Sequence, residues 1–147
     1  MFAWLELKTH CHATEDEAKV ARSLQALFPG AKPQITKTAG FHKNPILVIS
    51  ARTERAKDIK EFWRLMDSSG LVGRIVDSLK DEVDEGGLLH LRLGKQEAYL
   101  GKPAIARDED AIVVRMRIAR RPGAKATWLD EARDSIRGLL EKHVPGS

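Results

Sequence analysis

The chain has 147 residues, of which 42% are hydrophobic and 31% are charged, and its formal net charge is +4. This length and composition predict one globular domain over residues 1–147 and exclude a disordered or fibrous protein. The apolar runs are too short to cross a membrane, and the N-terminus is not typical of a secretory signal. Cys11 is the single cysteine, which excludes an internal disulfide and favours a reducing, cytoplasmic compartment.

An alternating pattern over residues 3–12 predicts a half-buried strand, with Leu5, Leu7 and Cys11 on the buried face. Residues 14–17 then predict the start of a helix, in which Thr14 caps the free amides and Glu17 reaches back to them. Apolar residues follow at spacings of three and four and give this helix one buried stripe: Val20, Ala21, Leu24, Leu27 and Phe28. The Pro-Gly pair at 29–30 ends it.

The middle of the chain predicts more strand and then two helices. Residues 31–44 are expected to form a weak strand and a loop, and residues 45–52, rich in Ile and Val, a clear strand. Thr53 is predicted to cap a helix that ends at 68–70 and buries Ile59, Phe62, Trp63 and Met66. A further helix is predicted from the spacing of Leu71, Ile75, Leu79 and Val83, ending near the Gly-Gly pair at 86–87.

Strand patterns return in the last third of the chain. Residues 89–93 alternate leucine with His90 and Arg92, residues 94–101 predict a turn or one to two helical turns, and residues 111–121 predict another strand. Thr127 is predicted to cap a closing amphipathic helix. This order of elements predicts an α+β fold in two layers, a mostly antiparallel sheet with helices on one face.

Positive charge gathers on the predicted open face of this sheet. Residues 88–125 are rich in Lys and Arg, and several of these alternate with the apolar residues of their strands. The face opposite the helices is therefore expected to carry Trp4, Lys8, His10, Arg92, Arg115, Arg117 and Arg121. A shallow cationic face can follow RNA phosphates while an aromatic ring stacks on a base, although a solvated face of an antiparallel sheet gives the same pattern.

Signals for catalysis are weak. His10 and His12 are two residues apart on a strand and, with Asp16 or His42, they could bind a metal, but no second ligand pair has metal-like spacing. Cys11 faces inward in the strand pattern, as a core residue does. We find neither a phosphate-binding loop nor a Ser/His/Asp arrangement, so we expect no enzyme activity, no metal and no cofactor.

Several segments of the chain resemble, in kind and order, those of one known family. They are residues 12–20 (His-Ala-Thr-Glu-Asp-Glu-Ala-Lys-Val), 44–46 (Asn-Pro-Ile) and 91–101, and the basic last strand follows them. It is a small archaeal family of RNA-binding proteins described as predicted exosome subunits, and the resemblance covers nearly the whole chain. Residues 94–98 read Gly-Lys-Gln-Glu-Ala where that family usually has Asp-Lys-Gln-Ala-Ala, which puts in doubt any role of the motif's acidic residue. The motif positions carried over are Lys95, Gln96 and Tyr99.

The resemblance implies a compact fold like that of a large-subunit ribosomal protein that binds ribosomal RNA, and a non-catalytic part in RNA processing or degradation. The leading hypothesis is thus an RNA-binding accessory protein docked on an RNA-degrading complex. One alternative is a protein-interaction module, in which acidic residues 77–85 and basic residues 88–125 dock complementary partners or a second copy. The other is a metal-dependent hydrolase that uses His10 and His12.

Overall fold

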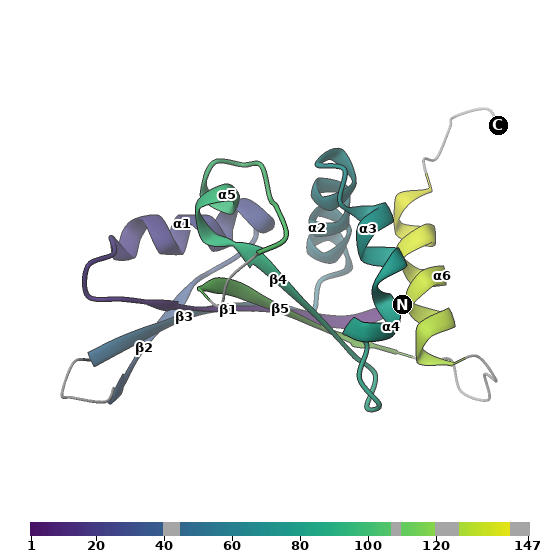
Figure 1. The fold of residues 1–147 in the computed structure, drawn as a ribbon, viewed down its shortest axis with the longest axis horizontal. Coiled ribbons are helices and arrows are strands. Elements are labelled where there is room, and N and C mark those ends of the chain that lie inside the picture. The colour runs from purple at the N-terminus through teal and green to yellow at the C-terminus, as the bar shows by residue number, and fades with distance from the viewer. Residues whose placement is uncertain (40–44, 107–109, 120–126, 142–147) are drawn as a thin grey trace.

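The computed structural model describes residues 1–39, 45–106, 110–119 and 127–141. Its five-stranded sheet is antiparallel throughout and has the order β2-β3-β1-β5-β4. The strands are β1 (Phe2–Cys11), β2 (Gln34–Ala39), β3 (Pro45–Thr53), β4 (Leu88–Gly94) and β5 (Ala111–Ile118). The helices are α1 (Glu17–Leu27), α2 (Ala56–Ser68), α3 (Val72–Asp77), α4 (Leu79–Glu82), α5 (Lys95–Tyr99) and α6 (Trp128–Leu140). These helices lie on one side of the sheet, which leaves its other face open (Figure 1).

The expected two-layer α+β fold is therefore confirmed, and the alternation in the strands explains it. In β1, Leu5, Leu7 and Cys11 are buried beneath the helices, as predicted. The register sets Leu7 opposite Ala51 of β3 and Val114 of β5, both of which are also buried. Because side chains alternate across a strand, these aligned residues give the sheet one continuous apolar face.

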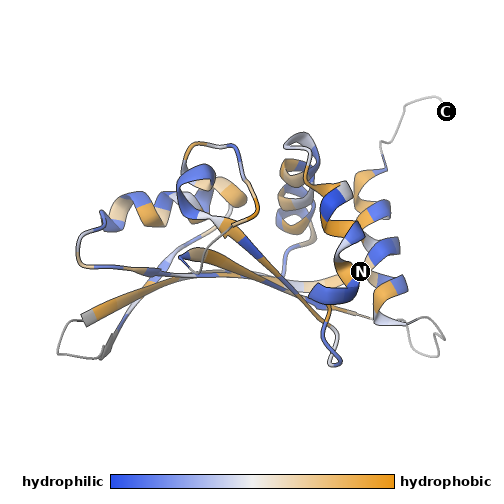
Figure 2. Cartoon of the chain, in the orientation of Figure 1, coloured by the Kyte–Doolittle hydropathy of each residue, from blue (hydrophilic) through white to orange (hydrophobic). Residues whose placement is uncertain are grey.

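Aromatic residues of α2 anchor the core. The predicted stripe of α2 is buried throughout: Ile59, Phe62, Trp63 and Met66. Trp63 stacks on Phe2 of β1 with 5.7 Å between ring centroids, and Phe62 meets Trp63 edge-on at 5.6 Å. Hydrophobic and hydrophilic residues alternate from turn to turn along α2 and α6, as expected for helices with one buried face (Figure 2).

The cap predicted for α1 is wrong. Asp16, and not Thr14, is the N-cap, and its Oδ1 accepts from Ala18 N at 2.9 Å and Lys19 N at 3.4 Å. The chain first makes a turn in which Glu15 N donates to His12 O at 2.9 Å. That turn delays the start of the helix by two residues, so Asp16 and not Thr14 stands directly before its first residue.

Two further helix boundaries differ from the prediction. Thr53 is the last residue of β3, and its Oγ1 donates to Asp58 Oδ2 at 2.7 Å and accepts from Arg55 N at 3.0 Å, whereas the N-cap of α2 is Arg55. The predicted helix over 71–83 divides into α3 and α4 at Ser78, whose Oγ donates to Arg74 O at 2.9 Å. A hydroxyl that bonds to the preceding turn competes with the helical ladder, which explains a break at this position.

The last strand and the last helix predicted from the sequence are both present in the structure. Strand β5 ends at Ile118, and residues 120–121 of the longer predicted strand lie outside the described residues. Thr127 caps α6 as predicted, with its side chain accepting from Asp130 N at 3.2 Å. Within the described residues, no helix combines the length and apolar character that a membrane span requires.

The helical layer consists of two groups. Helix α1 packs mainly against α5, and α2 packs mainly against α6, with α3 and α4 beside them. Figure 1 shows α1 and α5 over one half of the sheet and the other helices over the opposite half.

Candidate nucleic-acid interface

The open face of the sheet carries the outward side chains of the strands. Trp4, Lys8 and His10 alternate with the buried residues of β1, as do Arg92 in β4 and the two arginines of β5, Arg115 and Arg117. The structure therefore brings these predicted residues together on one surface. Arg121 lies outside the described residues.

Strand register arranges this face in rows that run across β1, β5 and β4. From one side to the other the rows are Lys8–Val113–Arg92, Glu6–Arg115–His90 and Trp4–Arg117–Leu88. Neighbouring strands are about 4.8 Å apart, so Lys8 and Arg92 start from backbone positions about 10 Å apart.

The arginines of β5 are already engaged within the protein. Arg115 forms an ion pair with Glu6 of β1, in which its Nε donates to Glu6 Oε1 at 3.1 Å and its Nη2 contacts the same oxygen. Arg117 Nη1 donates to Gly86 O at 2.6 Å, which uses one donor, and Arg117 has no ion-pair partner among the described residues. An arginine with other donors still directed outward can hold a phosphate as well.

Lys8 and Arg92 differ from the arginines of β5. Both side chains are exposed, and neither has an ion-pair partner among the described residues. An anion that binds them would displace only water and counterions. They are therefore the two cations of this face that are most available to a phosphate backbone.

Sequence reasoning missed Arg52, which also lies on the open face. It sits in β3 opposite Glu6, and its guanidinium carbon lies 4.5 Å from the centroid of the Trp4 ring. Arg52 is also within 3.6 Å of Glu54, and both side chains are largely exposed. The alternation of Arg52 with buried Ala51 and Thr53 was the signal that could have identified it. Because Arg52 covers one side of the indole, a base can stack on the other side or take the place of the guanidinium.

The predicted positions Lys95, Gln96 and Tyr99 are not on this face. They belong to α5, in the helical layer on the opposite side of the sheet (Figure 1). Gln96 and Tyr99 are exposed, but the side chain of Lys95 is only 10% exposed. The motif that led to these three residues therefore marks a second region of the molecule.

The Lys95 ammonium is held by oxygens from three segments. Its Nζ lies 2.6 Å from Asp110 Oδ1, 3.0 Å from Glu15 Oε1 and 2.6 Å from the backbone oxygen of His10. Burial alone would lower the pKa of Lys95, but the hydrogen bonds to Asp110 and Glu15 outweigh burial and raise it above its ordinary value. The same contact is the main cause that lowers the pKa of Asp110. The position of Lys95 indicates a structural ion pair and not an RNA contact.

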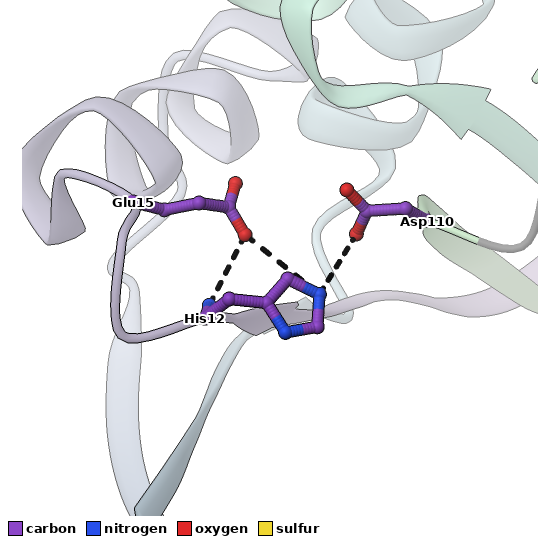
Figure 3. Close-up of side chains that lie close together, drawn as sticks. All are labelled: His12, Glu15 and Asp110. Carbon is purple, nitrogen blue, oxygen red and sulfur yellow. Dashed lines mark hydrogen bonds and ion pairs between the residues drawn. The ribbon is translucent and has the colours of Figure 1, made fainter.

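Among the residues that the structure describes, His12, Glu15 and Asp110 come closest to a metal-binding arrangement (Figure 3). His12 Nε2 lies 3.4 Å from Asp110 Oδ1 and 3.9 Å from Glu15 Oε1, and the three potential ligand atoms are within 4.8 Å of one another. The Lys95 ammonium already contacts both carboxylates and offsets one of their two negative charges. His10 projects to the open face, and His42 lies outside the described residues.

The fold and this surface define a class: a two-layer α+β domain with one helix-covered sheet face and one exposed cationic face. A family model described as "RNA binding" matches residues 4–118, and the chain belongs to that RNA-binding family. The expectation from the sequence motifs, that this chain belongs to an RNA-binding family, is thereby confirmed.

Relatives and solved structures agree with this family. RNA-binding protein PAB1135 from Pyrococcus abyssi is 31% identical over 145 residues, which cover 91% of this chain and 93% of the relative. The structure of Mth689, a DUF54 protein from Methanothermobacter thermautotrophicus, is 34% identical with a TM-score of 0.76 and covers 96% of this chain and 99% of its own. Protein AF2318 from Archaeglobus fulgidus is 27% identical with a TM-score of 0.77, covering 95% and 99%.

Proposed function

We propose that this protein binds RNA through the open face of its sheet and catalyses no reaction. The observation that carries the proposal is the row that holds Lys8 and Arg92, two exposed cations without ion-pair partners among the described residues. Arg117 and Trp4 lie in a nearby row of the same face. Membership of an RNA-binding family supports RNA as the polyanion that this surface recognises.

The side chains of this face suggest how RNA is held. Lys8, Arg92 and Arg117 neutralise phosphates, and the Trp4 ring stacks on a base. Phosphate contacts position a nucleic acid without reading its sequence, and no row of the face aligns several amide side chains toward base edges. We therefore expect weak sequence preference and a strong dependence on salt.

The titratable groups of the described residues support a non-catalytic role. Burial, reinforced by the nearby charge of Glu15, raises the pKa of the Cys11 thiol, so the thiol stays protonated and is a poor nucleophile. The charges of Glu15 and Asp110 are committed to Lys95. The group that most resembles a reactive centre is therefore occupied by an ion pair of the protein itself.

An accessory role in cytoplasmic RNA processing or degradation, on an exosome-like complex, rests on the motif resemblance, as does the likeness to a ribosomal protein fold. Because RNA would occupy the open face, a protein partner could still bind the helical side of the domain. Affinity purification after nuclease treatment tests this role. Recovery of ribonuclease subunits after nuclease treatment supports this role. If the subunits are lost once the RNA is digested, the protein's function is limited to RNA binding.

Fluorescence anisotropy with labelled single-stranded and duplex RNA, across a salt series, tests the proposed interface. The test variant is Lys8→Ala with Arg92→Ala. The matched control, Lys57→Ala with Arg64→Ala, removes the same charge from exposed positions of α2 in the helical layer. On single strands each lost phosphate contact lowers the slope of log K against log salt by about 0.7, so we expect a slope about 1.4 shallower for the test variant.

The control is expected to keep the wild-type slope. If both double variants lose the same affinity, net charge and not the open face accounts for binding. A folded Lys8→Ala/Arg92→Ala variant with unchanged affinity would exclude the proposed interface.

A further inference from the structure

The two groups of helices enclose a cleft between them. It has a volume of about 900 Å³ and is lined by α1, α5, the start of α3 and residues 104–106. Ligand pockets in proteins typically have volumes of about 300–1,000 Å³. The cleft lies in the helical layer, on the opposite side of the sheet from the open face, and contains the motif positions of α5.

Two cations from different helices line this cleft. Lys19 belongs to α1 and Arg74 to α3, both are exposed, and neither has an ion-pair partner among the residues that the structure describes. Carboxylates line the cleft as well, but most are engaged. Asp16 caps α1, and Glu15 and Asp110 hold Lys95.

Glu97 is the remaining carboxylate of the lining. It is exposed and lies over Gly94, because a Cβ built at position 94 would be 1.9 Å from Glu97 Oε2. Counted in full, the lining has one more carboxylate than cation, because Lys19, Arg74 and Lys95 stand against Glu15, Asp16, Glu97 and Asp110. An anion must therefore bind locally at Lys19 and Arg74, and the nearby carboxylates, Glu97 among them, weaken its binding.

Apolar surface lies beside these cations. Tyr99 is 38% exposed and Leu100 is 64% exposed, and both line the cleft together with the partly buried side chain of Ile105. Large apolar side chains are usually buried, so an exposed ring in the same cleft as two cations is a combination that suits a planar ring carrying a phosphate. A nucleotide has this chemistry.

The cleft is close to the open face around one edge of the sheet. Strand β4 is an edge strand, with Arg92 on the open face and Gly94 in the lining of the cleft two residues later. At about 3.3 Å per residue these positions are about 7 Å apart along the strand. Residues 104–106 run beside this edge, with Gly94 N donating to Ala104 O and Ala106 N donating to Arg92 O.

We propose that the cleft between α1, α3 and α5 binds one unstacked ribonucleotide of a single-stranded RNA. The base stacks on Tyr99, and its phosphate binds Lys19 and Arg74. The strand reaches the cleft from the open face by passing over the β4 edge, so this proposal rests on the proposed function and extends it. Duplex RNA cannot present an unstacked base, and the cleft therefore gives the protein a preference for single strands.

The first test is a titration of the protein with each of the four 5′-ribonucleoside monophosphates, followed by two-dimensional NMR of backbone amides. We expect saturable shifts in residues 94–100, weakened about tenfold in Tyr99→Leu, because one base–aromatic stack is typically worth that much. Tyr99→Phe keeps the ring and should bind like the wild type. Glu97→Gln, which removes the opposing charge, should bind more tightly.

The second test is the affinity for RNA strands. Tyr99→Leu should weaken binding of a single-stranded oligonucleotide about tenfold and leave duplex binding unchanged. Lys8→Ala/Arg92→Ala should weaken both RNAs but keep the binding of the mononucleotides. The two variants thus separate a failure of the cleft from a failure of the open face.

Three outcomes would overturn the cleft proposal. The mononucleotides could leave residues 94–100 unshifted, inorganic phosphate could produce the same shifts with no effect of Tyr99→Leu, or Tyr99→Leu could leave single-stranded RNA affinity unchanged in a folded protein. The second outcome identifies a simple anion site. An apolar segment of a protein partner would tolerate leucine as well as tyrosine, so the third points to such a partner.

Discussion

Replacing Lys95 with methionine tests whether this lysine serves the structure. Its ammonium joins the end of β1, the turn before α1 and the start of β5, through His10 O, Glu15 and Asp110. Methionine keeps most of the volume of the buried chain and removes the charge and its three donors. Glu15 and Asp110 then face each other without a cation.

The expected loss follows from burial. Removing one partner of a fully buried pair costs about 3–5 kcal/mol, and an exposed pair contributes about 0–1 kcal/mol. The Lys95 side chain is 10% exposed, but Asp110 is 52% exposed and Glu15 27%, so water rehydrates much of what the lysine leaves. We expect a loss of about 2 kcal/mol, and a fall in Tm of about 4–8 °C for a domain of this size.

The pH dependence of this difference has a defined sign. The pKa of Asp110 is lowered in the folded protein, so its contribution is present above the unfolded value of about 3.9 and is lost as pH falls through the folded value. The pKa of Lys95 is raised, so its contribution is complete below about 10.4 and is lost as pH rises through the folded value. The stability gap between wild type and variant is therefore greatest from about pH 5 to pH 9.

Urea unfolding followed by tryptophan fluorescence measures the gap, repeated within this pH range and beyond both of its ends, from about pH 3 to about pH 11. Lys102→Met is the matched control, because Lys102 is exposed and follows shortly after the end of the same helix. We expect the control to stay within about 0.5 kcal/mol of the wild type. A Lys95→Met variant as stable as the control, or a gap that does not change with pH, would refute the structural role.

Two further predictions concern the turn before β4. Gly87→Ala should destabilise the protein by about 2–4 kcal/mol in urea unfolding, because Gly87 has φ +84° and an added Cβ would lie 2.8 Å from the Trp128 ring; a loss below about 1 kcal/mol would contradict this packing. Asp84→Asn should lower the Tm at neutral pH, since Asp84 Oδ1 accepts from Gly86 N and Leu88 N at 2.9 Å. The hydrogen bond to His90 is the main cause that lowers the pKa of Asp84, so the difference should disappear as pH falls through that pKa, and a constant difference would count against it.

The open face could be predicted from the sequence because its signal is local. A strand repeats every two residues, so burying Leu89, Leu91 and Leu93 places Arg92 on the other side whatever the rest of the fold does. Arg52 obeys the same rule in β3. Arg52 lies outside the basic segment 88–125, so only the alternation within its own strand could identify it.

The residues that sequence reasoning misplaced depend on distant contacts. Thr14 was the expected cap, but the preceding turn is built on Glu15, whose carboxylate is held by Lys95 some 80 positions away. Lys95 itself stands in a motif that is similar to an RNA-binding family's, and nothing in its neighbours shows that its side chain is buried. A pattern within a segment cannot reveal which partner a charge will meet.

The exchange at Gly94 and Glu97 shows how such contacts tie positions together. The family that the motif resembles usually has an acidic residue at the first position and alanine at the second. In this chain the Glu97 carboxylate occupies the space that a side chain at 94 would use. In this chain the acidic group near the start of α5 is therefore that of Glu97.

The ion pairs within this protein, more than its net charge, determine which of its cations can bind a ligand. A formal charge of +4 describes a mildly basic chain and gives no location for a ligand. Arg115 is paired with Glu6 on the open face, and Lys95 is paired with Glu15 and Asp110 in the helical layer. Among the described residues, the exposed cations without an ion-pair partner include Lys8 and Arg92 on the open face and Lys19 and Arg74 in the cleft. A single RNA strand that crosses the β4 edge can contact both pairs, whereas a rigid duplex on the open face contacts only one.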